Sequence, residues 1–496
     1  MKEEIPAWVS KQKRKGTQVT RIGKNYYLYK ISSQWDPQKK RAVKVTEEYL
    51  GKITEEGLIP PKHERVKETY RHIAVREYGA SYFLQSISQD VQDELRRVFP
   101  YEWKELFSLA LFRLMEKSPL KHIGFYYANS YLSEIINGMR TSQKFLGPFL
   151  QRIGIRRELM KDFMRSFMIK ADYALIDLTH VFSYSENVIN AMLGHNKDSI
   201  YIPQVNLLLI YSLDMLQPVY FRLLPGSVRD VSSLIKTVNE TLVEKIVFIG
   251  DKGFYSDDNI KELRDNEIDY VFALKRNSSF ISYDIIIGGK RDKFDGYFLY
   301  QSRHVWYYTS RLNESEQIIT YLDSALKARE ENDLALRIQH LEEKNKEDEL
   351  NETQQKQLID YKTRLYDTSY RNGTLTVRTN LGKNPQEVYQ IMKSRVNIEQ
   401  VFDTFKNTLD ADRTYTRDDY QMEGWMFINF IAMQLYYKIY AILMRREILN
   451  NHSPMDVIIH LKRIHMLKMK DSWQIAEIPK KSITLIKKLG LDIPIT

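Results

Sequence analysis

Three acidic residues stand out in this sequence because of what surrounds them. Asp177 follows the apolar residues 173–176, near the end of a predicted β-strand, and Asp251 directly follows the apolar stretch 245–250. Ligand-binding groups collect at the carboxyl ends of strands because the neighbouring loops diverge there. An aspartate after an apolar strand is also a common helix cap or turn residue, so neither aspartate is diagnostic alone.

The third acidic residue, Glu399, belongs to a helical pattern. Arg395, Glu399 and Lys406 follow one another at spacings of four and seven, so they share one face of a predicted helix. An apolar stripe lies on the neighbouring side of this helix, formed by Ile398, Val401 and Phe405. Such a stripe favours packing against a sheet, with Glu399 at the edge of the contact. The alternative is an Arg–Glu pair on a solvent-exposed face.

Three carboxylates from two strands and a helix suit one chemistry in particular. Mg²⁺ prefers oxygen ligands and keeps water and phosphate in its shell, and two such ions about 3.5–4 Å apart promote phosphodiester displacement. Such a site needs no cysteine, and this chain has none, which excludes Cys-ligated zinc, iron–sulfur clusters and thiol nucleophiles. Arg395 and Lys406 would neutralise nucleic-acid phosphates beside the carboxylates.

The charge distribution also indicates a nucleic-acid partner. The 496 residues include 74 Lys and Arg against 64 Asp and Glu, which gives a net charge of +10. Residues 1–50 hold 12 basic and 5 acidic residues, including the cluster Lys13, Arg14 and Lys15. Basic residues here interleave with the tyrosines of the strand-like stretch 18–32, as in many nucleic-acid surfaces. A solvent-exposed basic arm is the alternative.

The elements that would position the acids follow in a definite order. Residues 82–170 have helical apolar spacing, and from about residue 172 the period changes to that of strands. Strands and helices are predicted in the order β-β-β-α-β-α-β at 172–179, 200–213, 217–227, 230–242, 245–250, 256–266 and 269–274. This is the order of a ribonuclease-H-like domain, whose catalytic carboxylates lie on or just after strands.

Residues 276–384 interrupt this order and are predicted to be an insertion. Residues 294–310 are strand-like, and residues 373–378 are expected to pair with them. Residues 323–364 contain 8 basic and 11 acidic residues and no aromatic residue before Tyr361. This segment indicates a long exposed helix or helical hairpin, with a charged linker as the alternative.

With these motifs in place, the sequence resembles bacterial insertion-sequence transposases of the DDE type with a YREK signature. The resemblance covers roughly residues 170–450 and rests on Asp177-x-Thr179, Pro225-Gly226-Ser227…Asp230, Asp251-x-Gly253-Phe254-Tyr255-Ser256, Arg395-x3-Glu399-x6-Lys406 and Glu423-Gly424…Phe430. It implies cleavage at transposon ends and transfer of the 3′-hydroxyl ends into target DNA. It implies that Asp177, Asp251 and Glu399 hold two Mg²⁺ ions, for which Mn²⁺ can substitute.

The resemblance also implies that Arg395 and Lys406 grip the transposon end. One position departs from the signature, because Met392 stands where the family has a tyrosine that is thought to contact DNA. Tyr389 lies about one turn earlier on an adjacent face and is a candidate substitute.

The expected fold class is α/β, with a ribonuclease-H-like core, an insertion containing strands, a preceding β-rich and helical DNA-binding region and a helical C-terminal region. The expected boundaries are 1–75 (basic, β-rich), 76–170 (helical, DNA-binding), 171–275 with 385–412 (core), 276–384 (insertion) and 413–496 (helical). The apolar stretch 424–444 contains Asn429, Gln434 and Lys438, so a buried core helix is expected rather than a membrane span.

The expected partners are double-stranded DNA, as inverted-repeat ends and target, and a second protomer, since joining two ends usually takes a homodimer. No membrane partner is expected, and the predicted location is the bacterial cytoplasm, associated with the nucleoid. Two alternatives are open: a catalytically impaired transposase that only binds DNA, and another ribonuclease-H-like nuclease acting on branched DNA or hybrids. Cleavage assays with Mg²⁺ or Mn²⁺ discriminate between them.

Overall fold

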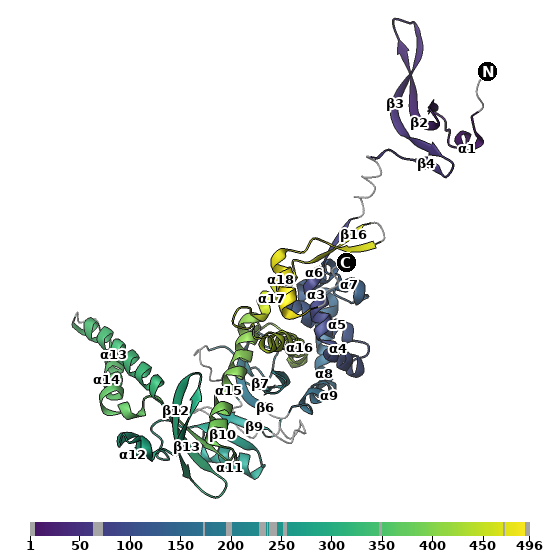
Figure 1. Ribbon diagram of the computed structural model, residues 1–496. Helices are drawn as coiled ribbons and strands as arrows, with labels where there is room; N and C mark the ends of the chain where they lie inside the picture. Colours follow the sequence, from purple (N-terminus) through teal and green to yellow (C-terminus); the bar gives the residue numbers. More distant parts are fainter. Residues whose placement is uncertain are drawn as a thin grey trace. The chain divides into compact units, whose positions relative to one another are not determined.

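The computed structural model describes residues 5–62, 73–171, 174–194, 201–227, 246–250, 255–346, 350–469 and 472–491, together with Ile235 and Thr237 (Figure 1). The chain divides into two compact units. The first unit comprises residues 1–79, 460–486 and 491–496, and the second comprises residues 80–459 and 487–490. Both ends of the sequence therefore belong to the first unit.

A four-stranded antiparallel sheet, in the order β1-β2-β3-β4, opens the first unit. It is preceded by a short helix, and the elements are α1 (Ala7–Ser10), β1 (Thr17–Ile22), β2 (Asn25–Asp36), β3 (Arg41–Thr54) and β4 (Gly57–Ile59). Val9, Leu28 and Ile53 form its buried cluster. The prediction of strands in residues 18–32 is therefore confirmed, and the Tyr- and Val-rich composition of the stretch explains it.

A three-stranded sheet in the same unit joins distant parts of the sequence. Its middle strand β16 (His465–Met469) pairs antiparallel with β17 (Ser472–Ile475) and with β5 (Ala74–Glu77). In the sequence, α17 (Pro454–Leu461) precedes this hairpin and α18 (Lys480–Leu489) follows it. The C-terminal region thus contains strands as well as the predicted helices.

The second unit begins with the predicted helical block. Its elements are α3 (Gly79–Ile87), α4 (Gln89–Val98), α5 (Trp103–Glu116), η1 (Leu120–His122), α6 (Ile123–Asn129), α7 (Leu132–Ile135), α8 (Gln143–Ile155) and α9 (Arg157–Met168). Of the apolar residues at helical spacing in α5, Trp103 is half-buried and the others are fully buried: Leu106, Phe107, Ala110, Leu111 and Leu114. Residues 105–115 of α5 are all buried, so helical spacing predicted the helix correctly, but the helix is buried on all sides rather than on one face.

The most apolar helix of the chain, α16 (Asp419–Arg445), lies in the core of the second unit. It is long and apolar enough to cross a membrane, but 78% of its most apolar window is buried in the protein. It packs against α5, α8 and β8. The approach to α8 is close, because a Cβ on Gly424 would overlap the carbonyl group of Leu150. The prediction of a core helix at this position is confirmed.

The strands around the candidate site lie in two sheets, β15-β6-β7-β8 and β11-β12-β13-β14-β10-β9, which a parallel bridge joins. β6 (Ala174–Ser183) pairs antiparallel with β7 (Gln204–Ser212), which pairs antiparallel with β8 (Gln217–Pro225). On the other side of β6, a parallel bridge joins Ala174 to Ile246, next to β9 (Val247–Gly250). β9 pairs parallel with β10 (Asp269–Ala273), and α11 (Asp257–Asp265) lies between these two in the sequence.

These bounds agree with the predicted strands within a few residues. Of the helix predicted at 230–242, only Ile235 and Thr237 are described, and both are helical. β15 (Arg413–Thr414) pairs parallel with the last residues of β6. The helix that carries Glu399 is α15 (Pro385–Asp403), which contacts β6 and β10 and continues into the π-helical turn η5 (Thr404–Thr408).

The predicted insertion extends the sheet beyond β10. Its elements are α12 (Asp284–Ile287), η2 (Arg291–Lys293), β11 (Gly296–Tyr300), β12 (Arg303–Arg311), β13 (Gln317–Asp323), α13 (Ser324–Lys346), α14 (Glu352–Lys362), η3 (Thr363–Asp367), η4 (Ser369–Arg371) and β14 (Thr374–Thr379). The expected pairing of residues 373–378 with 294–310 is wrong. Residues 294–310 form the hairpin β11–β12, and β14 pairs with β13 and β10 instead.

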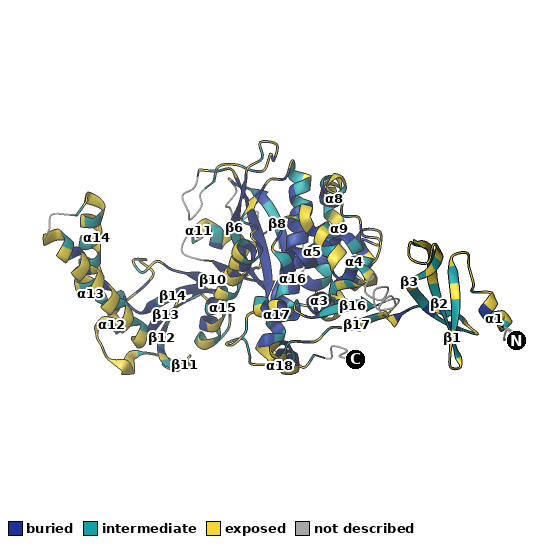
Figure 2. Cartoon of the chain, turned by 90° about the horizontal axis from the view of Figure 1, so that it is seen from above, coloured by how far each residue is buried: buried dark blue, intermediate teal, exposed yellow. Residues whose placement is uncertain are grey.

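The charged segment of the insertion is helical. α13 and α14 pack against each other as a hairpin, and Figure 2 shows that most of their surface is exposed. Buried side chains on α13 are confined to Leu334, Ile338 and Leu341, which follow helical spacing. A salt bridge between Lys362 Nζ and Glu342 Oε1 at 2.7 Å links the two helices. Of the two alternatives for this segment, the helical hairpin is therefore the one found.

Candidate active site

Asp177 lies in the middle of β6 rather than near its end. Its partner across the ladder is Leu209, and pairing with β7 continues to Phe182, so the strand extends beyond the predicted residue 179. The residue is 9% exposed. One carboxylate oxygen accepts a hydrogen bond of 2.8 Å from the backbone N–H of Leu178. The carboxylate is thus held on a rigid, nearly buried strand.

Glu399 is placed by the local structure of α15. The helix begins where the Asn384 side chain accepts a hydrogen bond from the Glu387 N–H, with Pro385 at the first helical position. The apolar stripe is buried as predicted, with exposures of 1%, 0% and 0% for Ile398, Val401 and Phe405. Glu399 itself lies at the edge of the contact, because its side chain is half exposed.

Arg395 links the two carboxylates. Its Nη2 atom lies 3.6 Å from Asp177 Oδ2 and 3.4 Å from Glu399 Oε1. The two oxygens are therefore no more than 7.0 Å apart, the sum of these distances, although the residues come from a strand and a helix far apart in sequence. The Arg395 side chain is 16% exposed, so this is not merely an ion pair on a solvent-exposed helix face.

Lys406 contacts β6 at a different residue. Its Nζ lies 3.2 Å from His180 Nε2. Lys406 lies in the π-helical turn η5, where the chain no longer has the period of an α-helix. The predicted α-helical face shared with Arg395 and Glu399 therefore does not extend regularly to Lys406. His180 is 9% exposed and was not predicted as a site residue; residues three apart on a strand point to opposite faces, so its spacing from Asp177 carried no signal.

Tyr389 is packed into the insertion. It is 2% exposed, and its ring lies 4.9–5.3 Å from those of Phe298, Tyr300 and Tyr321. Burial raises the pKa of Tyr389 to about 12. Met392 is also buried. Tyr389 is therefore packed among aromatic rings and almost fully buried, and its predicted contact with DNA stays a prediction.

Asp251, the remaining predicted carboxylate, lies outside the described residues, as does Asp230 of the resemblance. The nearest described residues on either side of Asp251 are Gly250, at the end of β9, and Tyr255. The hydroxyl of Tyr255 accepts a hydrogen bond of 3.0 Å from Arg378 Nη1, which also lies 3.2 Å from Asp257 Oδ1. Arg378 on β14 thus anchors the segment that follows Asp251.

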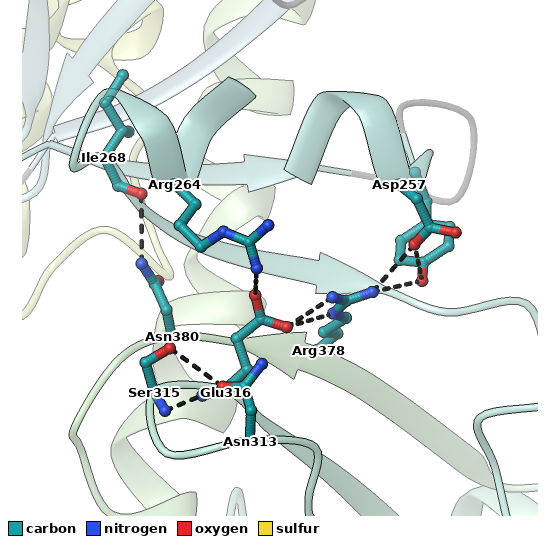
Figure 3. Close-up of polar contacts among 9 residues, drawn as sticks. Asp257, Arg264, Ile268, Asn313, Ser315, Glu316, Arg378 and Asn380 are labelled. Carbon is teal, nitrogen blue, oxygen red and sulfur yellow. Dashed lines mark hydrogen bonds and ion pairs between the residues drawn. The ribbon is translucent and has the colours of Figure 1, made fainter. Parts of the chain in front are cut away.

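Arg378 in turn belongs to a buried ionic network around Glu316 (Figure 3). Both Arg378 Nε and Nη2 donate to Glu316 Oε2, and Arg264 Nη1 lies 3.3 Å from Glu316 Oε1. The Glu316 side chain is fully buried, and that of Arg378 is 8% exposed. Burial acts to raise the pKa of Glu316, but the hydrogen bonds from Arg378 and the positive charges of Arg378 and Arg264 outweigh burial and lower it.

The basic residues predicted to bind DNA at the start of the chain are exposed. Lys13, Arg14 and Lys15 lie between α1 and β1, in the first unit. The Thr17 hydroxyl donates a hydrogen bond of 2.7 Å to the Arg14 carbonyl group, which orders this turn. Asp177 and Glu399 belong to the second unit.

The carboxylates fit a hard cation. Asp177 and Glu399 together have four carboxylate oxygens, the ligand type that Mg²⁺ prefers. Both carboxylates already lie beside the positive charge of Arg395. Within the described part of the chain, no group of three or more His, Cys, Asp or Glu side chains is arranged to hold a metal ion. The third predicted ligand, Asp251, is not among those residues.

Comparisons with known proteins fit this geometry. A family model described as "Transposase DDE domain" matches residues 179–435, which is just over half of the chain. The match includes Arg395, Glu399 and Lys406 and begins two residues after Asp177. A search of curated proteins finds no match.

Among solved structures, one match is a cryo-EM structure of a piggyBac transposase synaptic complex with hairpin DNA. Sequence identity is 10% and the TM-score 0.38, over 73% of this chain and 69% of that one. The family assignment comes from the sequence match across residues 179–435. The chain belongs to the family of proteins with a transposase DDE domain.

Proposed function

We propose that this protein is an active DNA transposase of the bacterial insertion-sequence type with a YREK-like signature. It cleaves DNA strands at transposon ends and transfers the 3′-hydroxyl ends into target DNA. The observation that carries the proposal is the position of Arg395, within 3.6 Å of Asp177 and 3.4 Å of Glu399. An Arg–Glu pair that only stabilised its own helix would not also contact a buried aspartate on a neighbouring strand.

The catalytic core in this proposal is ribonuclease-H-like and interrupted by an insertion. The order β8-β7-β6 in one sheet and the parallel pair β9-β10 in the next, joined by the parallel bridge from Ala174 to Ile246, support it. The position of β11–β14, α13 and α14 between β10 and α15 supports the insertion at 276–384. The core would comprise 171–275 and 385–412, between a DNA-binding region at 1–170 and a C-terminal region at 413–496.

Asp177, Asp251 and Glu399 would hold two Mg²⁺ ions, and Mn²⁺ would substitute. When bound, the ions supply activation of the attacking oxygen and stabilisation of the leaving oxygen in phosphodiester displacement. Arg395 balances the two carboxylates and is placed to contact a phosphate. Lys406 would contact the phosphate backbone near His180. Lys13, Arg14 and Lys15 would bind DNA from the first unit.

The proposed partners are double-stranded DNA, as transposon inverted-repeat ends and target, and a second copy of the chain on paired ends. The net charge of +10 and the family assignment support a DNA partner. We place the protein in the cytoplasm, at the nucleoid. Sizing of the protein with and without end DNA tests the dimer, which a monomeric complex on paired ends would contradict.

Strand cleavage by matched variants tests the proposed site. Asp177→Asn and Glu399→Gln should abolish Mg²⁺-dependent cleavage of a plasmid carrying the gene with its flanking DNA, and should leave DNA binding intact. Asp403→Asn is the matched control, because Asp403 is exposed on the same helix and bonded to Asn407. Undiminished cleavage by both site variants would overturn the assignment.

A second candidate function is a DNA-binding protein that does not cleave. The specific observation in its favour is that Met392 replaces the signature tyrosine and that Tyr389 is buried among aromatic rings. The wild-type protein would then bind end DNA without cutting it in either Mg²⁺ or Mn²⁺. Cleavage in either ion removes this candidate.

A further inference from the structure

The segment 413–417, with the sequence Arg-Thr-Tyr-Thr-Arg, begins with the short strand β15 and presents alternate side chains to solvent. Thr414 and Thr416 are 3% and 8% exposed, whereas Arg413, Tyr415 and Arg417 are exposed. Because burial alternates along the segment, the two arginines flank the tyrosine on the open side. No role described above uses these three residues.

The segment is fixed to the strand that carries Asp177. β15 pairs parallel with the end of β6, where the Phe182 N–H donates to the Asp412 carbonyl group at 2.8 Å. One step further, the Tyr184 N–H donates to the Thr414 carbonyl group at 3.2 Å. Backbone anchoring of this kind holds the exposed side chains in place before any ligand arrives, which reduces the entropic cost of binding.

Tyr184 and Tyr415 form a stacked pair on this anchored surface. Their ring centroids are 5.2 Å apart and their planes differ by 12°. Tyr415 is 77% exposed and Tyr184 is 42% exposed. A stacked aromatic pair in a protein core is buried on both sides, but here the outer face of the pair is open to solvent. An open aromatic face suits a flat, apolar partner.

The chemistry around the pair indicates which partner. Aromatic rings interleaved with arginines bind single-stranded nucleic acid, because bases stack on the rings while the basic groups follow the phosphates. The pair lies just past the end of β6, the strand on which Asp177 contacts Arg395 and His180 contacts Lys406. From Asp177 to Tyr184 is seven residues, roughly 23 Å of strand. DNA that occupied the carboxylate site could extend over this distance.

We propose that Tyr415 and Tyr184 form a stacking platform for DNA bases that are unpaired or unstacked near the reacting end, with Arg413 and Arg417 contacting the adjoining phosphates. Paired bases inside a duplex hide their faces, so the platform acts on single-stranded or frayed DNA. This proposal rests on the proposed transposase function and assigns it an additional DNA contact, separate from the carboxylates.

The test measures the affinity of the full-length protein for a fluorescent single-stranded oligothymidylate. An oligomer of about 20 nucleotides is long enough to span one aromatic-lined site of ~4–16 nucleotides. Tyr415→Ala should weaken binding roughly 5- to 150-fold, which corresponds to about 1–3 kcal/mol of stacking, and should leave the salt dependence unchanged. Tyr415→Phe should bind like wild type, because the stacking face remains.

Variants of the two arginines test the phosphate contacts, and an exposed tyrosine elsewhere serves as the control. Arg413→Ala and Arg417→Ala should each reduce the slope of log K against log salt by about 0.7, the value for one phosphate contact on a single strand. Tyr366→Ala is the control, since Tyr366 is 68% exposed in the insertion. It should bind DNA like wild type.

Several results would overturn the proposal. Equal affinities for Tyr415→Ala and Tyr366→Ala would do so, as would a Tyr415→Ala variant that changes the oligomeric state but not DNA affinity, since the pair would then contact a second protomer. The outcome is separable from that of the proposed function. If Glu399→Gln abolishes cleavage while Tyr415→Ala has no effect, the function stands and the platform fails. A wild-type protein that neither binds nor cleaves DNA contradicts both.

Discussion

The buried ion pair between Glu316 and Arg378 offers a quantitative test of how the second unit is held together. Arg378 lies on β14, and Glu316 directly precedes β13. The pair therefore links two neighbouring strands of the insertion, β13 and β14. Arg378 also holds Tyr255 and Asp257, which follow Asp251 in the sequence. We consider Glu316→Leu, Arg378→Met and the combination of both.

The burial of the pair sets the expected magnitudes. Removing one member of a buried ion pair leaves an uncompensated charge and costs about 3–5 kcal/mol, whereas replacing both by apolar residues is often nearly neutral. Both side chains are less than a tenth exposed. Arg264 still reaches Glu316 when Arg378 is lost, so Arg378→Met should cost about 3 kcal/mol, the lower end of that range. The double variant should cost clearly less than the sum of the two single variants.

The assay is hydrogen exchange of backbone amides in β10, β13 and β14, because it reports the local free energy of opening in a chain with two units. Amides of β1 and β2, in the first unit, serve as the internal reference. Each single variant should lower protection in the three strands, and the double variant should restore much of it. Additive losses in the double variant would refute the account of a coupled, desolvated pair.

Three further predictions concern packing, pH and DNA contact. Gly424→Ala should cost about 1–3 kcal/mol in thermal unfolding because its Cβ would overlap the backbone of α8, whereas Gly382→Ala, with open space around it, should be nearly neutral. The pKa of Glu316 is lowered in the folded protein, so the ionised Glu316 stabilises the fold above about pH 4.3, and this stabilisation is lost as the pH falls through the lower pKa of the folded state. The difference in hydrogen-exchange protection of β14 between wild type and Glu316→Gln should therefore shrink at acidic pH. Lys406→Ala should reduce the salt slope of duplex binding by about 0.9, and Arg337→Ala on the insertion should not change it.

Elements with a strong local signal could be predicted from the sequence. The strands β6 to β10 and the helix α5 follow from apolar runs and helical spacing, which are local properties. The apolar stripe of α15 predicted correctly that Glu399 lies at the edge of a contact with the sheet. The meeting of Asp177 and Glu399 around Arg395 agrees with the expectation of a joint site, and the metal-binding role of these residues stays a prediction.

Features that depend on distant partners could not be predicted in the same way. β13 was missed because its apolar residues lie between polar turns and a charged helix, and its burial depends on pairing with β12 and β14. The hairpin of β16 and β17 has half-exposed strands whose partner, β5, lies near the other end of the sequence. Tyr389 was judged by helical spacing alone, but aromatic side chains of the insertion bury it.

A metal-specificity switch at Asp177 tests the central claim most directly. The chain has no cysteine, so Asp177→Cys introduces the only thiol. Thiolate is a soft ligand that suits Mg²⁺ poorly and softer ions better. We predict that Asp177→Cys cleaves end-bearing DNA undetectably in Mg²⁺ and recovers part of its activity when Mn²⁺ or Cd²⁺ is added, while Asp403→Cys cleaves normally in Mg²⁺. Full activity of Asp177→Cys in Mg²⁺ alone would contradict a metal-binding role for Asp177 and, with it, the proposed site.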